Sequence, residues 1–190
     1  MTKKRMMITL VLVAGLTALP PVARTLPQGT AGAKANPGES QIVLAQWNDV
    51  GRKLIAMAED FPEDKYDFKA TPAVRSFAEQ LLHAAGAMYY FTSTVQGQTL
   101  VTEDPPRTKY KTKAEVVAFV KKSVEDGAAA IKAKGDKGMA DWITEPESKQ
   151  QSHVSDLAYG LLEHSGEHYG QLVVYYRLAG MVPPESRPKK

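Results

Sequence analysis

The sequence predicts an all-α protein, a four-helix bundle, and three observations support this fold class. Four segments place apolar residues three or four positions apart, which is the spacing of one face of an α-helix. No segment shows the two-residue alternation that is typical of a half-buried strand. Proline, glycine and capping residues separate the four segments. Four amphipathic helices of this length bury their apolar faces against one another in a bundle.

The first predicted helix covers residues 40–60. Its apolar residues alternate steps of four and three, and they form a bundle-type seam of Val43, Trp47, Val50, Leu54, Met57 and Phe61. Pro62 ends the helix, because proline has no backbone N–H and its ring clashes with the preceding turn.

The second predicted helix opens after Thr71, with Thr71 as its N-cap and Pro72 at the first helical position. Gly97 ends it. Its apolar stripe consists of Val74, Phe77, Leu81, Ala84, Met88, Phe91 and Val95. His83 lies on a neighbouring face of this helix, away from the centre of the stripe.

The third predicted helix starts at Thr112, and Glu115 three residues later completes a capping box. Its seam consists of Val117, Val120, Val124 and Ile131, with Ala128 beside it. Gly135 and Gly138 indicate that a loop follows.

The fourth predicted helix covers residues 148–179, after a loop that contains Trp142 and Pro146. Gly180 suits the position just past the helix end, where the backbone adopts a left-handed conformation. The two prolines that follow, Pro183 and Pro184, prevent the helix from continuing.

The N-terminal residues are typical of a secretory signal. A basic start of Lys3, Lys4 and Arg5 precedes an uncharged apolar run over 8–19, which is too short to span a bilayer. We therefore expect a signal peptide over residues 1–23, a flexible linker over 24–39 and the bundle domain over 40–186. The mature chain is then exported, periplasmic or secreted, and is not a membrane protein. An uncleaved segment that tethers the chain to a membrane is the alternative.

Composition excludes several classes of function. The net charge of +3 is too small to indicate nucleic-acid binding. The chain has no cysteine, which excludes disulfides, thiolate metal sites, iron–sulfur clusters and cysteine nucleophiles. Any bound metal must therefore have nitrogen and oxygen ligands.

His164 and His168 are the most informative residues for function. Side chains four residues apart lie on the same face of a helix, so the two imidazoles can bind one divalent transition metal ion. Both fall on the apolar stripe of the fourth helix, where a buried polar ring needs a partner. A hydrogen-bonded pair of core histidines explains the pattern equally well.

His83 is a candidate third ligand from another helix, and three nitrogens would leave coordination positions open, as in catalytic metal centres. Periodicity alone does not decide whether it belongs to the site. Zn, Ni, Fe and Cu are all compatible with imidazole ligands. His153 precedes His164 by three helical turns, too far for the same ion, and is assigned to the helix start or the surface.

Other chemistries have little support. Residues 164–168 also match the His-x-x-Glu-His signature of inverted zinc peptidases, with Glu167 as general base. Those enzymes need a mixed α/β fold and a further glutamate ligand well downstream, which this sequence does not show. No phosphate-binding loop or serine nucleophile motif is present. The catalytic residues stay unknown, and no organic cofactor site is predicted.

Three separated elements resemble the DinB-like family over about residues 40–186. His164 and His168 are followed by Gly-Gln-Leu, a Tyr-x-Arg segment, a glycine and Pro-Pro, as in the last helix of that family. The run 76–83 is similar to the family's helix that leads to a metal-ligand histidine. The first helix, with Trp47 and its Phe-Pro ending, is consistent with the family. Many members carry Glu and an additional His where this chain has Ser165 and Glu167.

The resemblance implies a four-helix bundle, often dimeric, with a divalent metal (Zn, Ni or Fe) held by His83, His164 and His168. Characterised members include thiol-dependent S-transferases and a mycothiol-dependent isomerase, in which the metal activates a thiol. We therefore expect an exported, metal-dependent homodimeric enzyme of S-transferase or hydrolase type that acts on a small molecule, with a thiol or water activated. A non-catalytic metal-binding or interaction protein on the same bundle is the alternative, and a metal-free structural bundle is a third.

Overall fold

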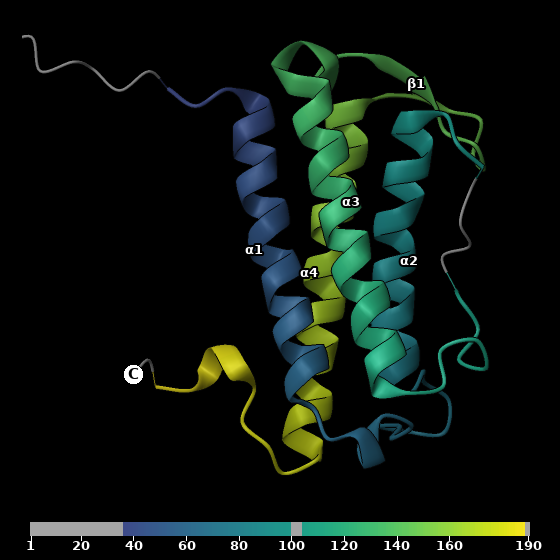
Figure 1. Ribbon diagram of the computed structural model, residues 1–190, viewed down its shortest axis with the longest axis vertical. Helices are drawn as coiled ribbons and strands as arrows, with labels where there is room; N and C mark the ends of the chain where they lie inside the picture. Colours follow the sequence, from purple (N-terminus) through teal and green to yellow (C-terminus); the bar gives the residue numbers. More distant parts are fainter. Residues whose placement is uncertain (1–35, 100–103, 189–190) are drawn as a thin grey trace, which may run out of the picture. The chain divides into compact units, whose positions relative to one another are not determined.

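Four long helices make up the domain, which confirms the predicted fold class (Figure 1). The computed structural model describes residues 36–99 and 104–188, and all structural statements concern these residues. The helices are α1 (Glu39–Asp60), α2 (Phe77–Gln96), α3 (Lys113–Met139) and α4 (Val154–Leu178). Short 3-10 turns η1 (Glu63–Lys65) and η2 (Pro184–Ser186) follow α1 and α4. Two strands, β1 (Trp142–Thr144) and β2 (Gln151–His153), precede α4.

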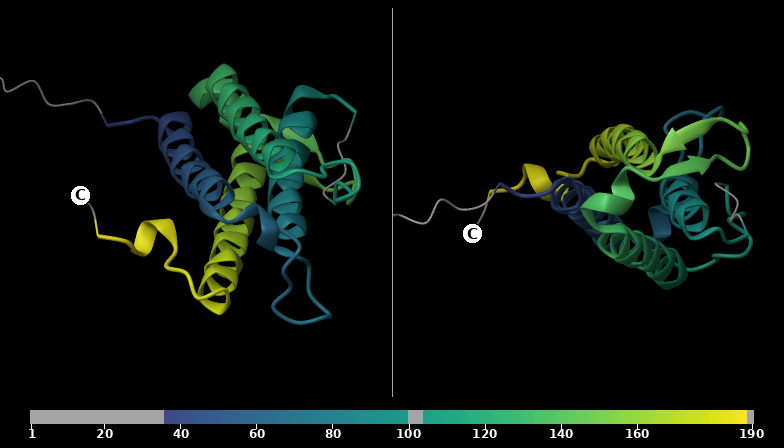
Figure 2. Two further views of the ribbon diagram at one scale, coloured as in Figure 1. Left: turned by 60° about the horizontal axis from the view of Figure 1, so that its bottom comes forward. Right: turned by 90° about the horizontal axis from the view of Figure 1, so that it is seen from above.

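Each helix packs against two neighbours: α1 lies against α3 and α4, and α2 also lies against α3 and α4. In Figure 1, α2 and α3 run upward while α1 and α4 run downward, and the two further views in Figure 2 show the same arrangement. Helices α2 and α4 are therefore adjacent and antiparallel. This pairing places the first half of α2 beside the middle and second half of α4.

The closest packing joins α1 to α3. The Trp47 side chain is fully buried, and its indole N–H donates to the backbone carbonyl of Val124 at 2.9 Å. Gly127 lies directly under the indole ring, because a Cβ there would come within 3.0 Å of Cη2 and closer still to two other ring atoms. Gly51 of α1 likewise leaves room for the Val124 side chain. Two glycines therefore permit the two backbones to approach.

An aromatic cluster closes one end of the bundle. Phe61 and Phe77 stack with ring centroids 3.8 Å apart, and Tyr176 packs on Phe61 at 4.9 Å. The buried hydroxyl of Tyr176 donates to the Met57 carbonyl at 2.9 Å, and that of Tyr66 donates to the Ala58 carbonyl at 2.5 Å. Each buried hydroxyl therefore has an acceptor, which removes the cost of burying it.

Helix α2 begins five residues later than predicted. Thr71 and Pro72 lie in a turn, and Ser76 caps the helix through a capping box with Glu79. The Glu79 N–H donates to the Ser76 hydroxyl at 3.2 Å, and the Ser76 N–H donates to the Glu79 carboxylate at 2.6 Å. Carbonyls of the preceding loop accept from the next two N–H groups of the helix. Helix α2 therefore starts at the Ser-x-x-Glu capping box and not at Thr71-Pro72, since this start satisfies more of the N–H donors of the first turn.

The segment before α4 forms an antiparallel β-hairpin, where helix from residue 148 and no strand were predicted. Trp142 pairs with His153, and their rings lie 4.0 Å apart. Aromatic and β-branched residues in β1 favour this strand, but three residues are too few to show a period. His153 lies at the start of α4, as predicted, and its N–H donates to Asp156 at 3.2 Å.

The remaining helix boundaries agree closely with prediction, except at the end of α3, where the loop predicted at Gly135 and Gly138 is wrong. The capping box of Thr112 and Glu115 starts α3, and Gly180 follows α4 with a φ of +75°. Gly135 interrupts α3 with a φ of +58°, and helical turns resume beyond it to Met139. The predicted signal peptide and residues 24–35 of the predicted linker lie outside the described residues. In the described part of the chain, no helix is long and apolar enough to cross a bilayer.

Candidate metal centre

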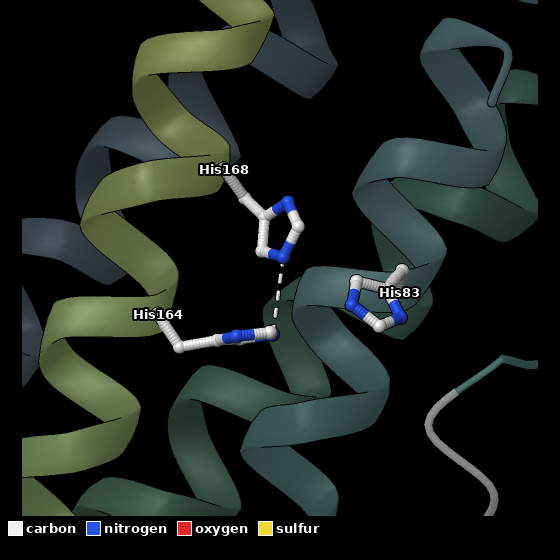
Figure 3. Close-up of side chains that lie close together, drawn as sticks. All are labelled: His83, His164 and His168. Atoms are coloured by element: carbon white, nitrogen blue, oxygen red, sulfur yellow. Dashed lines mark hydrogen bonds between the residues drawn. The ribbon is translucent and has the colours of Figure 1, made fainter. Parts of the chain in front are cut away.

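The three histidines predicted as ligands lie together between α2 and α4. His83 comes from the second turn of α2, and His164 and His168 come from successive turns of α4 and point toward it (Figure 3). The ring centroid of His83 lies 5.1 Å from that of His164 and 4.7 Å from that of His168. Each histidine offers one ring nitrogen, and these nitrogens all lie within 4.8 Å of one another.

The spacing of these nitrogens suits one metal ion. The Nε2 atoms of His164 and His168 are 3.1 Å apart. Two imidazole nitrogens bound to the same zinc ion at its usual bond length are about 3.3 Å apart in a tetrahedral site. All three nitrogens lie within 4.8 Å of one another, so they would need to approach by at most about 1.5 Å to share such an ion. The donor set, three imidazoles and no thiolate, therefore fits a divalent transition metal.

A carboxylate orients His83. Nδ1 of His83 lies 3.0 Å from an oxygen of Asp104, which also accepts from Arg75 at 3.0 Å. When Nδ1 carries the proton and donates to Asp104, the lone pair is left on Nε2. This is the usual arrangement of a metal-bound histidine and its supporting carboxylate.

Two glutamines surround the outer side of the His168 ring. Nδ1 of His168 lies 3.2 Å from Oε1 of Gln171 and also contacts the side-chain nitrogen of Gln80, which donates to Gln171. Two proton arrangements fit. If Nδ1 donates to Gln171, Nε2 has a free lone pair for a metal. If Gln80 donates to Nδ1, Nε2 carries a proton and can donate to His164.

Burial keeps His168 neutral at physiological pH. His83 and His168 are buried, with exposed fractions of 8% and 6%, and His164 is half-buried. Loss of hydration, and after it the nearby rings of His164 and His83, lower the pKa of His168 to about 4. A metal ligand must be unprotonated, so this environment prepares His168 for coordination.

We expect the protein, freed of metal by a chelator, to lose stability as the pH falls from about 6.5 to about 4. In this interval the unfolded chain protonates His168 and the folded chain does not. Because the unfolded state binds more protons, the free energy of unfolding decreases as the pH decreases, by about 1.4 kcal/mol per unit of pKa difference. Urea unfolding at several pH values measures this slope.

The His168→Ala variant is the reference for this slope. It lacks the ring, so its stability should change less over the same interval. An equal slope in both proteins would contradict the assignment of this pH dependence to His168, since the acidic groups that also affect stability are common to both proteins.

The other residues considered from sequence lie elsewhere. His153 stacks on Trp142 at the hairpin, and Glu167 is exposed on α4. Ser165 is fully buried, and its hydroxyl has no hydrogen-bond partner among the described residues. Asp104, Gln80 and Gln171 were not identified as supporting residues. Gln171 belongs to the Gly-Gln-Leu motif that follows His168, and this motif could have indicated it as a supporting residue. Asp104 lies in a loop whose path no local pattern predicts.

Comparison with known proteins agrees with the resemblance seen in the sequence. The family model of the DinB superfamily matches residues 20–172. Among solved structures, a DinB-like protein from Bacillus cereus has a TM-score of 0.64 and 16% sequence identity, and the match covers 75% of this chain and 93% of that chain. At this identity the likeness concerns the fold. No curated protein sequence matches the chain.

Proposed function

The chain belongs to the DinB superfamily, and from this premise we propose that it is a metal-dependent enzyme with His83, His164 and His168 as its metal ligands. The observation that carries the proposal is the convergence of three imidazole nitrogens within 4.8 Å. Three protein ligands leave coordination positions for other molecules, which distinguishes catalytic from closed structural sites.

The chemistry proposed is activation of a thiol or of water, for S-transfer or hydrolysis. A divalent transition metal lowers the pKa of a thiol or water ligand, so that the nucleophilic anion is present near neutral pH. The residues around the three histidines would fix the orientation of their rings. Asp104 orients His83, and Gln171 orients His168 through its Nδ1. We also propose that the chain is exported, on the basis of its basic and apolar N-terminal residues. Assembly as a homodimer is a further part of the proposal.

A non-catalytic metal-binding protein is the second candidate. Asp104, the carboxylate that contacts the cluster, already accepts from both His83 and Arg75. It is therefore poorly placed to act as a general base. This observation favours a protein that binds metal without turnover.

The test combines metal content with turnover. Elemental analysis of the purified protein should find about one transition-metal ion per chain, and a panel of thiol and ester substrates then tests activity. His164→Ala should lose both metal and turnover. His153→Ala is the matched control, because that ring lies at the hairpin, and it should retain both.

The outcomes separate the candidates. Metal that is lost in His164→Ala, without turnover on any substrate, would favour the non-catalytic protein. If reconstitution with Zn, Ni, Fe or Cu gives no stoichiometric binding, the metal-dependent function is wrong and the histidines are core residues.

A further inference from the structure

A cavity of about 650 Å³ lies beside the histidine cluster. Its walls are mostly apolar and come from Val74, Val174, Tyr175 and two alanines of the loop before α2. Val74 and Val174 are 40% and 50% exposed, and they are among the few large apolar side chains that the described residues leave this accessible. Cavities of this size and polarity bind small organic molecules.

Arg75 is the one charged side chain that lines this cavity in the described part of the chain. Its Nη2 donates to Asp104 at 3.0 Å, and the guanidinium has further N–H groups on Nε and Nη1 for which the described residues provide no acceptor. Among the described residues, the cavity lining includes no carboxylate. An anion on Arg75 would share the guanidinium with Asp104, which is the nearest like charge, and a carboxylate can accept two parallel hydrogen bonds from a guanidinium.

The position of Arg75 is set by its surroundings. The Tyr175 hydroxyl donates to the backbone carbonyl of Arg75, and the Tyr175 ring packs edge-on against Phe68 and Phe77. Arg75 also directly precedes Ser76, the N-cap of α2. These contacts fix the backbone of Arg75, so an anion needs to order little of the main chain on binding.

The cavity adjoins the metal centre through the two glutamines. Gln80 and Gln171 line it, and both contact Nδ1 of His168. Each glutamine is three residues from a histidine of the cluster on its own helix, which is about 4.5 Å along the helix axis. The two glutamines and the His168 ring therefore lie between this part of the cavity and a metal bound at Nε2 of His168.

We propose that this cavity binds a small organic acid, with its carboxylate on Arg75 and its apolar body between Val74, Val174 and Tyr175. The role of this acid as the substrate of the metal centre rests on the proposed function, whereas its binding does not. The class of substrate is then a carboxylic acid with a short aliphatic or aromatic body.

Calorimetric titration of the full, metal-loaded chain tests the proposal with two probes, phenylacetate and phenylacetamide. They share shape and ring and differ in charge. Phenylacetate should bind at least about tenfold more tightly, because the amide cannot accept two charge-assisted bonds from Arg75. Arg75→Gln should remove this preference, and Arg75→Lys should restore part of it, since lysine keeps the charge and loses the planar fork.

Arg52→Gln is the matched control. Arg52 is also an exposed arginine with carboxylate partners, Asp49 and Glu185, but it lies on α1 and does not line the cavity. This variant should keep the full preference for phenylacetate. Equal binding of the two probes to the unchanged protein, binding of neither, or an unchanged preference in Arg75→Gln would each overturn the proposal.

Metal content is measured on the same samples, so the two proposals can fail separately. A preference for phenylacetate in a protein that binds no metal would leave the acid site standing and remove the metal-dependent function. Stoichiometric metal without a preference for phenylacetate would leave the metal-dependent function standing and remove the acid site.

Discussion

Saturation with a divalent transition metal is expected to raise the unfolding temperature of this protein by about 10 °C over the chelated form. A ligand present at a thousand times its dissociation constant stabilises the folded state by about 4 kcal/mol when it binds only that state. For a domain of this size, each kcal/mol corresponds to about 2–4 °C. The ligands come from α2 and α4, so the ion also links two helices that unfolding separates. Scanning calorimetry with and without added metal measures the shift.

The His168→Ala variant should lose this metal-dependent shift. The quantity compared is the difference between loaded and chelated samples of each protein, so a change in the stability of the variant itself does not affect the conclusion. His153→Ala should keep the full shift, because its ring stacks on Trp142 at the hairpin. A shift that persists in His168→Ala would place the ion elsewhere, and no shift in the unchanged protein would exclude tight binding.

Gly127→Ala is expected to destabilise the fold by about 2–3 kcal/mol, although alanine is the better helix former. The added methyl would overlap with the indole of Trp47, which is fully buried. The ring cannot turn away easily. Its N–H donates to the Val124 carbonyl at 2.9 Å, and it packs on Phe91 with centroids 5.1 Å apart. Relief therefore requires α1 and α3 to move apart, and urea unfolding measures the cost.

Gly160→Ala provides the control for helix propensity. Gly160 lies on the exposed side of α4, and no atom lies within 4 Å of a Cβ built there. This substitution should stabilise the protein by up to about 1 kcal/mol. Opposite signs for the two substitutions would confirm the close approach of α1 and α3, whereas a neutral or stabilising Gly127→Ala would contradict it. Metal content should be unchanged in Gly160→Ala.

The contacts of Asp104 connect the two proposed sites. Its carboxylate accepts from His83 and from Arg75, one a proposed metal ligand and the other the proposed binding group for an acid. A carboxylate on Arg75 would compete with Asp104 for that arginine. The strength of the hydrogen bond from His83 to Asp104 would then depend on whether the cavity is occupied.

Helix positions could be predicted from the sequence because helical periodicity is a local property. The steps from Val43 to Phe61 locate α1 to within one residue at its start. Boundaries were less certain where two local signals competed. Thr71 and Pro72 suggested a start for α2, but the loop carbonyls that complete the capped first turn at Ser76 are contributed by residues that become adjacent only in the fold.

Taken by itself, the sequence determined the four helices and the shared face of His164 and His168, since both follow from the periodicity of one helix. Family resemblance added His83, which periodicity left open. Only the tertiary structure decided that His83 meets the other two, that Asp104 and Gln171 support them, and that Arg75 lines an adjacent cavity. The physical reason is that these contacts join α2, α4 and the loop before α3. Their distances depend on how whole elements pack, which no spacing within a single segment encodes.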